Sequence, residues 1–198
     1  MGHQSCQVDP RRQNNRMIYH LSLQTAGIIA GVFLILASLP GLVKPDLAVI
    51  AQRFPRSRLA GVVLLTIDLA WSFWLVITME MGEFSSFRRP LMIALPAGYL
   101  LLVRFVDEFL SVRALGVLCL LAAEPLLDAA FLRYEPSRLL ITSFAYLLII
   151  AGLFWAAVPY LLRDQINWSA RTPLRWRFLH GIALSYGVLI LSLAFTRY

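Results

Sequence analysis

Long apolar blocks alternate with short polar breaks along this chain. A helix that crosses about 30 Å of hydrocarbon needs roughly 20 mainly apolar residues. Blocks of about this kind lie at 25–43, 59–79, 91–103 (or to 110), 114–132, 139–162 and 179–196. The pattern predicts an all-α polytopic membrane protein. We expect a six-transmembrane-helix bundle in one domain, 24–198, behind a polar N-terminal tail, 1–23.

The third block is the shortest because Arg104 interrupts it. If the helix continues to Leu110, Arg104 and Glu108 stand four residues apart and can pair near the membrane surface. The basic tail before the first block resembles the start of a secretory signal peptide. A repeat within the chain argues that this first block is retained.

The repeat joins the first and fifth blocks. IIAGVF at 28–33 recurs as IIAGLF at 149–154, and each copy is followed by a proline, a basic residue and an aspartate. The third block carries a looser version of this pattern. Three parallel helical-hairpin repeats would explain the pattern, and chance similarity between apolar segments is the alternative.

Composition supports the membrane interpretation. The chain is 59% hydrophobic, and its formal net charge is +7. The basic residues lie almost entirely between the apolar blocks, which favours contact with lipid headgroups and not with nucleic acid. Two polar segments, 46–58 and 163–178, have the composition of interfacial helices or loops. Their predicted headgroup-contacting residues are Arg53, Trp168, Arg171, Arg175, Trp176 and Arg177.

Three acidic residues fall inside apolar blocks. Asp68 lies in the second block, and Glu124 and Asp128 lie in the fourth. An acidic residue at the centre of a membrane helix costs roughly 2.5 to 3.5 kcal/mol on insertion scales, so such residues usually face the protein interior or a water-filled cavity. Counted from Arg58 and Arg113, Asp68 and Glu124 reach similar depths. If the two blocks are neighbours, three carboxylates can converge.

Unpaired ionised carboxylates are unfavourable in a low dielectric, so these groups need protons, a cation or hydrogen bonds. Ser72, Thr142 and Tyr146 are the predicted supporting polar residues. Pro125 cannot donate to the carbonyl of Leu121 and is expected to kink the fourth helix beside Glu124. The acids either hold the bundle together or form a proton or cation site.

The sequence contains no phosphate-binding loop, nucleophile elbow or zinc-protease motif. We therefore expect no cofactor, no metal site and no catalytic residues. The leading hypothesis is a non-enzymatic accessory or scaffold protein whose buried carboxylates stabilise the bundle. A small proton- or cation-coupled transporter using Asp68, Glu124 and Asp128 is the first alternative. An intramembrane lipid-modifying enzyme, with a sparse polar cluster at Arg104, Asp107 and Glu108, is the second.

The expected partners are membrane lipids and either other membrane subunits or a second copy of the chain. A bacterial cytoplasmic (inner) membrane is the expected location. With six spans, both termini share a side, which collects eight basic residues against ten on the other. That difference leaves the orientation open under the positive-inside rule.

Overall fold

A computed structural model describes residues 21–44, 47–79, 82–106, 109–131 and 138–196. These residues form eight α-helices and two short 3₁₀ helices and contain no strand, so the all-helical prediction is confirmed for them. The elements are α2 (Leu23–Val43), α3 (Leu47–Arg53), η1 (Phe54–Arg56), α4 (Arg58–Thr78), η2 (Gly82–Phe87), α5 (Arg88–Phe105), α6 (Leu110–Ala130), α7 (Arg138–Ala157), α8 (Tyr160–Ala170) and α9 (Pro173–Thr196).

Five of the described helices are long and apolar enough to cross a membrane: α2, α4, α6, α7 and α9. The third predicted span corresponds to α5, whose eighteen residues include Arg88, Arg89 and Arg104. These arginines shorten its apolar stretch below that of the other five. α5 ends at Phe105 and α6 begins at Leu110, so the chain leaves the helix before Leu110.

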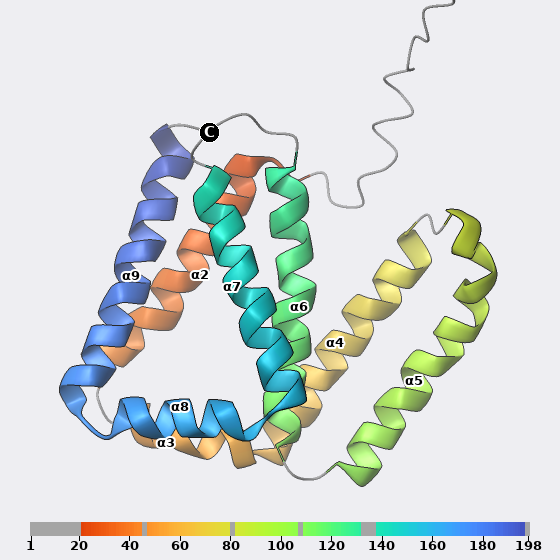
Figure 1. The fold of residues 1–198 in the computed structure, drawn as a ribbon, viewed down its shortest axis with the longest axis horizontal. Helices are drawn as coiled ribbons and strands as arrows, with labels where there is room; N and C mark the ends of the chain where they lie inside the picture. Colours follow the sequence, from red (N-terminus) through yellow and green to blue (C-terminus); the bar gives the residue numbers. More distant parts are fainter. Residues whose placement is uncertain (1–20, 45–46, 80–81, 107–108, 132–137, 197–198) are drawn as a thin grey trace, which may run out of the picture.

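The long helices alternate in direction. In Figure 1, α2, α5 and α7 run toward the end of the molecule where α3 and α8 lie, and α4, α6 and α9 run away from it. The short helices α3 and α8 cross this end at a steep angle to the long ones and contact each other. We call it the α3–α8 end: it comprises α3, η1, α8 and the adjoining ends of the long helices.

Two helix pairs and a satellite hairpin make up the molecule. α2 packs along α9, and α6 packs along α7 (Figure 1). A cluster of buried residues from all four helices joins the two pairs at the end opposite the α3–α8 end, with Ala30, Ala123, Ala145 and Ile190 among its members. The α4–α5 hairpin leans away from them and is attached through the first half of α4, which packs on α6 (Figure 1).

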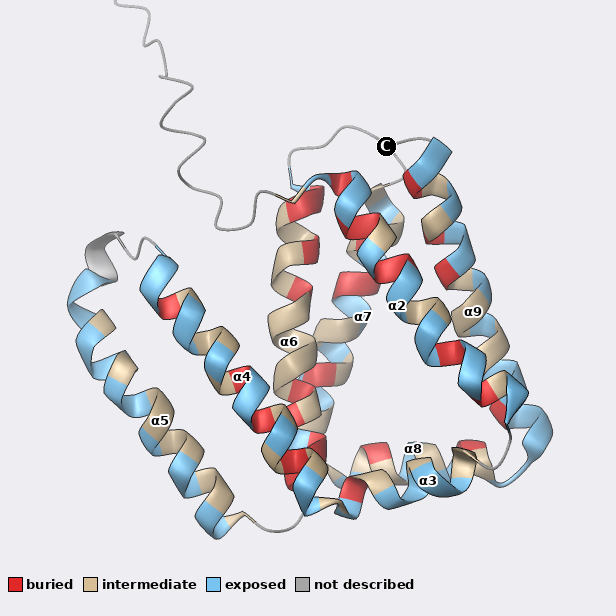
Figure 2. Cartoon of the chain, turned by 180° about the vertical axis from the view of Figure 1, so that it is seen from behind, coloured by how far each residue is buried: buried red, intermediate tan, exposed pale blue. Residues whose placement is uncertain are grey.

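Glycine and alanine are common at the buried positions of this fold, and many large apolar residues lie outside. The buried positions of α2 are mostly glycine and alanine, whereas its exposed positions include Phe33 and Leu36, which are 61% and 65% exposed. The same contrast recurs in α7, where Gly152 is buried and Leu153 is 61% exposed. Figure 2 shows exposed residues along α2, α4, α5 and α9, whereas α6 is mostly buried or intermediate. Close backbone approach through small residues is the way helices pack in lipid, where the solvent is as apolar as a leucine side chain.

The repeated IIAG segments place a glycine at each of the two main helix crossings. A Cβ atom added to Gly152 of α7 would lie 2.7 Å from the carbonyl oxygen of Gly116 of α6. A Cβ atom on Gly31 of α2 would lie 3.0 Å from the carbonyl oxygen of Gly187 of α9. Gly31 and Gly152, the corresponding glycines of the two segments, therefore each allow a close backbone approach, in separate helix pairs.

Proline acts differently in the two copies. α2 continues through Pro40 to Val43, and the backbone N–H of Lys44 donates to the Pro40 carbonyl. α7 instead ends at Ala157, just before Pro159, which caps the start of α8. The predicted fifth span, 139–162, therefore covers α7 and the first residues of α8. Pro173 opens α9 six residues before the predicted sixth span, and a first-turn proline needs no backbone donor.

Candidate functional site

The second and fourth predicted spans, α4 and α6, are direct neighbours. Gly61 of α4 fits against the start of α6, where a Cβ atom added to it would lie 2.7 Å from the backbone nitrogen of Ser111. Leu65 packs with Leu110 and Ala114 in the same interface. The two helices run in the same direction (Figure 1). This is the arrangement that a shared carboxylate site requires.

Asp68 lies at the midpoint of α4 and is 3% exposed. Neither of its carboxylate oxygens has a hydrogen-bond partner among the residues that the structure describes. Its carboxylate is close enough to the thiol of Cys119 on α6 to interact with it electrostatically. Asp68 is therefore a polar group held between two membrane-type helices without a visible donor.

Glu124 and Asp128 are half-buried on α6, one turn apart, and interact electrostatically. Asp128 stands fourteen residues after Ala114, which puts it on the same side of α6 as the contact with α4, but α4 has leaned away from α6 at this depth (Figure 1). The helix register does not bring Asp68 level with Glu124. Because Gly61 meets Ser111, Asp68 comes opposite the region of Cys119, and Glu124 lies about 7.5 Å farther along the axis at 1.5 Å per residue.

The predicted supporting hydroxyls have varied surroundings. Ser72 is half-buried one turn beyond Asp68 on α4. The hydroxyl of Thr142 donates to the carbonyl of Arg138 in its own helix at 3.0 Å. Tyr146 is 55% exposed and lies on the outer surface of α7. Tyr186 of α9 donates its hydroxyl to the Leu140 carbonyl at 2.8 Å, which links α9 to α7.

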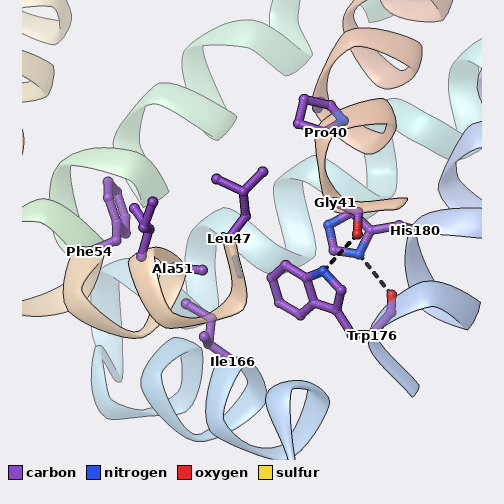
Figure 3. Close-up of a pocket in the computed structure, with 10 residues that line it drawn as sticks. Pro40, Gly41, Leu47, Ala51, Phe54, Ile166, Trp176 and His180 are labelled. Carbon is purple, nitrogen blue, oxygen red and sulfur yellow. Dashed lines mark hydrogen bonds between the residues drawn. The ribbon is translucent and has the colours of Figure 1, made fainter. Parts of the chain in front are cut away.

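A pocket of about 340 Å³ lies at the α3–α8 end. It is an open pocket, lined by the last turns of α2, by α3 and η1, by α8 and by the first turns of α9 (Figure 3). Its lining is almost entirely apolar and includes Pro40, Leu47, Ala51, Phe54 and Ile166. Asp68, Glu124 and Asp128 are not among the residues that line it.

Trp176 and His180 form the polar corner of this pocket. The indole N–H of Trp176 donates to the carbonyl of Gly41 at 2.9 Å, and Nδ1 of His180 lies 2.9 Å from the Trp176 carbonyl (Figure 3). Since a carbonyl only accepts, Nδ1 carries the proton in this bond. The two rings are 4.3 Å apart. Gly41 must lack a side chain, because its Cβ would lie 2.2 Å from the imidazole ring.

The predicted headgroup-contacting residues divide into two groups. Arg53, Arg171, Arg175 and Arg177 are exposed at the α3–α8 end. Trp168 is half-exposed there, and the guanidinium of Arg175 lies 5.1 Å from the centre of its ring. Trp176, in contrast, is 7% exposed and faces the pocket.

Sequence reasoning did not single out the Gly41–Trp176–His180 corner. The four-residue spacing of Trp176 and His180 is a local signal that the two rings share a helix face. Nothing in the sequence links that face to Gly41, because the contact joins the first and last long helices.

The sparse polar cluster suggested for an enzyme includes Asp107 and Glu108, which lie outside the described residues. Within the described part of the chain, no group of three or more His, Cys, Asp or Glu side chains is placed to hold a metal ion. No protein-family model, curated protein or solved structure matches this chain.

Proposed function

We propose that this chain is a multi-pass integral membrane protein with six crossing helices, resident in a bacterial cytoplasmic membrane. Large apolar side chains directed outward from α2, α4, α7 and α9 support membrane residence. The contact between α3 and α8 supports a sixth crossing by α5. If α5 did not cross, α3 and α8 would emerge on opposite sides of the membrane.

The six helices form three hairpins in parallel orientation, α2–α4, α5–α6 and α7–α9. Support comes from the contacts, since each hairpin packs its second helix on the first helix of the next: α4 on α5, α6 on α7, and α9 on α2. The glycines of the two IIAG segments, at separate helix crossings, provide further support. The middle hairpin has no described transverse helix, unlike the other two.

The proposed activity is that of a non-enzymatic accessory or scaffold protein in a larger membrane assembly. The observation that carries this proposal is that no residue of α5 is buried (Figure 2). α5 contacts α4 through a narrow stripe, with a Thr66–Tyr99 hydroxyl contact of 3.1 Å and packing confined largely to its second half. A helix that contributes so little to its own fold offers its remaining surface to a partner helix.

Cysteine cross-linking in the membrane tests the assembly role. Single cysteines replace Ile93 or Leu100 of α5, which are 71% and 65% exposed, in a variant lacking Cys6 and Cys119. Leu147→Cys and Leu153→Cys on α7 are matched controls, being 59% and 61% exposed. We expect a discrete cross-linked adduct from the α5 positions and none from the α7 positions. The mass of the adduct shows whether the partner is a second copy of the chain or another subunit. The proposal would be contradicted if the α5 positions gave no adduct, or if the α7 positions gave adducts in equal abundance.

A second candidate function is a proton or cation site in a small coupled transporter, and the observation that favours it is Asp68. An acidic side chain held at the middle of a membrane-type helix without a hydrogen-bond donor must be neutralised by a proton or a bound cation. Glu124 and Asp128 lie farther along α6, one turn apart. Together the three acids would provide successive positions for a proton along α4 and α6.

A further inference from the structure

The pocket at the α3–α8 end has the size and lining of a ligand site. Its volume of about 340 Å³ falls within the range of roughly 300 to 1,000 Å³ that is typical of small-molecule sites. Five elements that lie far apart in the sequence converge to build it (Figure 3). It is therefore a feature of the complete fold and not of one helix surface.

The pocket wall is suited to hydrocarbon. Its indole N–H is already bonded to the Gly41 carbonyl, and Nδ1 of His180 is bonded to the Trp176 carbonyl. Nε2 of His180 is the remaining side-chain polar atom of the lining. An occupant with many polar groups would lose its hydrogen bonds to water here without replacing them, whereas an acyl chain would gain free energy with each methylene that it buries.

The surroundings of the pocket are strongly basic. Arg53 directly precedes the lining residue Phe54, Arg171 ends α8, and Arg175 directly precedes the lining residue Trp176. All three guanidinium groups are exposed. At this end of the described chain Asp164 is the one acidic residue, and it is paired with Arg163 at 2.9 Å. Guanidinium groups bind phosphate oxygens through charge-assisted hydrogen bonds.

We propose that the α3–α8 pocket holds one acyl chain of an anionic phospholipid, whose phosphate is bound by Arg171 and Arg175 with Arg53 nearby. The occupant follows from charge complementarity: an apolar chain site whose flanking segments carry exposed arginines matches an anionic amphiphile and not a zwitterionic lipid. This inference rests on the proposed membrane residence but not on the proposed assembly role. It makes α3 and α8 part of a specific lipid site and not only surface anchors.

Native mass spectrometry of the full-length protein in detergent tests the proposal. Phosphatidylglycerol and phosphatidylethanolamine with identical chains are added in equal amounts, and lipid-bound populations are compared. Ala51→Phe fills the pocket from α3, and Ala37→Leu narrows it from α2. Val49→Phe introduces the same phenyl ring at a 52% exposed position of α3 outside the lining. Arg171→Gln with Arg175→Gln removes the headgroup contacts, and Arg89→Gln is the control at the opposite end.

We expect one tightly retained phosphatidylglycerol and weaker retention of phosphatidylethanolamine. Either pocket variant should weaken that binding about tenfold, the effect of excluding roughly two methylenes, while Val49→Phe leaves it unchanged. The double arginine variant should remove the preference for the anionic lipid, and Arg89→Gln should not. Unfolding temperatures of all variants identify any that fail to fold, and the pocket effect must appear in at least one folded variant.

Two results would overturn the proposal. Equal retention of both lipids by the wild-type protein would show that Arg53, Arg171 and Arg175 do not select the anionic lipid. Displacement of the lipid by millimolar inorganic phosphate would show a simple anion site that does not use the pocket. Neither result depends on the α5 cross-links, so failure of the assembly role and failure of the lipid site are distinguishable.

Discussion

Asp68 is the residue on which the two candidate functions differ. In a scaffold, a neutral acid in the α4–α6 interface is tolerated as part of the packing. In a proton carrier, the same residue must gain and lose charge. The sequence showed that Asp68, Glu124 and Asp128 lie inside apolar blocks. It did not show their relative depth, because the start of α6 is fixed by the fit of Gly61 against Leu110 and Ser111 and not by the arginines that precede the acids.

We expect Asp68→Leu to stabilise the protein relative to Asp68→Asn. Leucine removes two buried oxygen atoms that have no hydrogen-bond partner, whereas asparagine keeps a polar group there. An unsatisfied buried polar group costs about 1 to 3 kcal/mol, so the free energies of unfolding of the two variants should differ by about that amount. Denaturant titration in mixed micelles measures the difference. A less stable leucine variant would show that Asp68 has a partner that it needs.

Flux measurements on the same positions separate the functions. Protein reconstituted into vesicles that contain a pH-sensitive dye is compared with Asp68→Asn and with the double variant Asp68→Asn, Glu124→Gln. A proton carrier loses its pH-driven flux in both variants while its unfolding temperature is unchanged. Wild-type vesicles without flux above that of empty vesicles would refute the carrier.

At the scale of elements, glycine determines how closely the helices pack. The sequence revealed the IIAG repeat, but the residues that face it could not be read from periodicity. Gly116 opposes Gly152, whereas Gly181, which follows a similar basic opening in α9, has open space around it. Proline is equally dependent on its surroundings, since Pro40 lies within α2 and Pro159 separates α7 from α8. Such differences arise from packing between elements that are distant in the chain.

We expect Gly152→Ala and Gly181→Ala to have opposite effects on stability. The added methyl at Gly152 meets the backbone of α6 at 2.7 Å, and such overpacking costs about 1 to 3 kcal/mol. The methyl at Gly181 meets nothing within 4 Å, and alanine is favoured over glycine in a helix by about 0.5 to 1 kcal/mol. Unfolding of both variants in one detergent gives the comparison. Equal stability would mean that the α6–α7 crossing relaxes easily.

At the scale of the whole molecule, the number of crossings determines the side of every loop from α5 onward. The sequence predicted long apolar helices, and five are present in the described residues. The sequence did not decide whether α5 crosses the membrane, because arginines at both ends leave it only a short apolar stretch. The position of that stretch is set by its packing against α4. The contact between α3 and α8, which supports six crossings, joins segments more than a hundred residues apart.

Cysteine labelling from outside intact cells tests the sixth crossing. Gln52→Cys on α3, Ser86→Cys on η2 and Thr172→Cys between α8 and α9 are introduced singly, and all three positions are exposed. With six crossings, Thr172→Cys reacts from the same side as Gln52→Cys, and Ser86→Cys reacts from the other. With five, Thr172→Cys would instead share the side of Ser86→Cys, which would overturn the proposed topology.

The packing of α2 on α9 also has a consequence for biosynthesis. Among the described long helices, α2 leaves the ribosome before the others, and α9, its main partner, leaves after them. Until α9 arrives, the small-residue face of α2 around Gly31 is covered only by lipid or by a membrane chaperone. Folding therefore cannot finish helix by helix during translation, and contacts between such distant segments form slowly. Any change that delays the insertion of α9 should extend the period in which the incomplete protein is open to quality-control proteases.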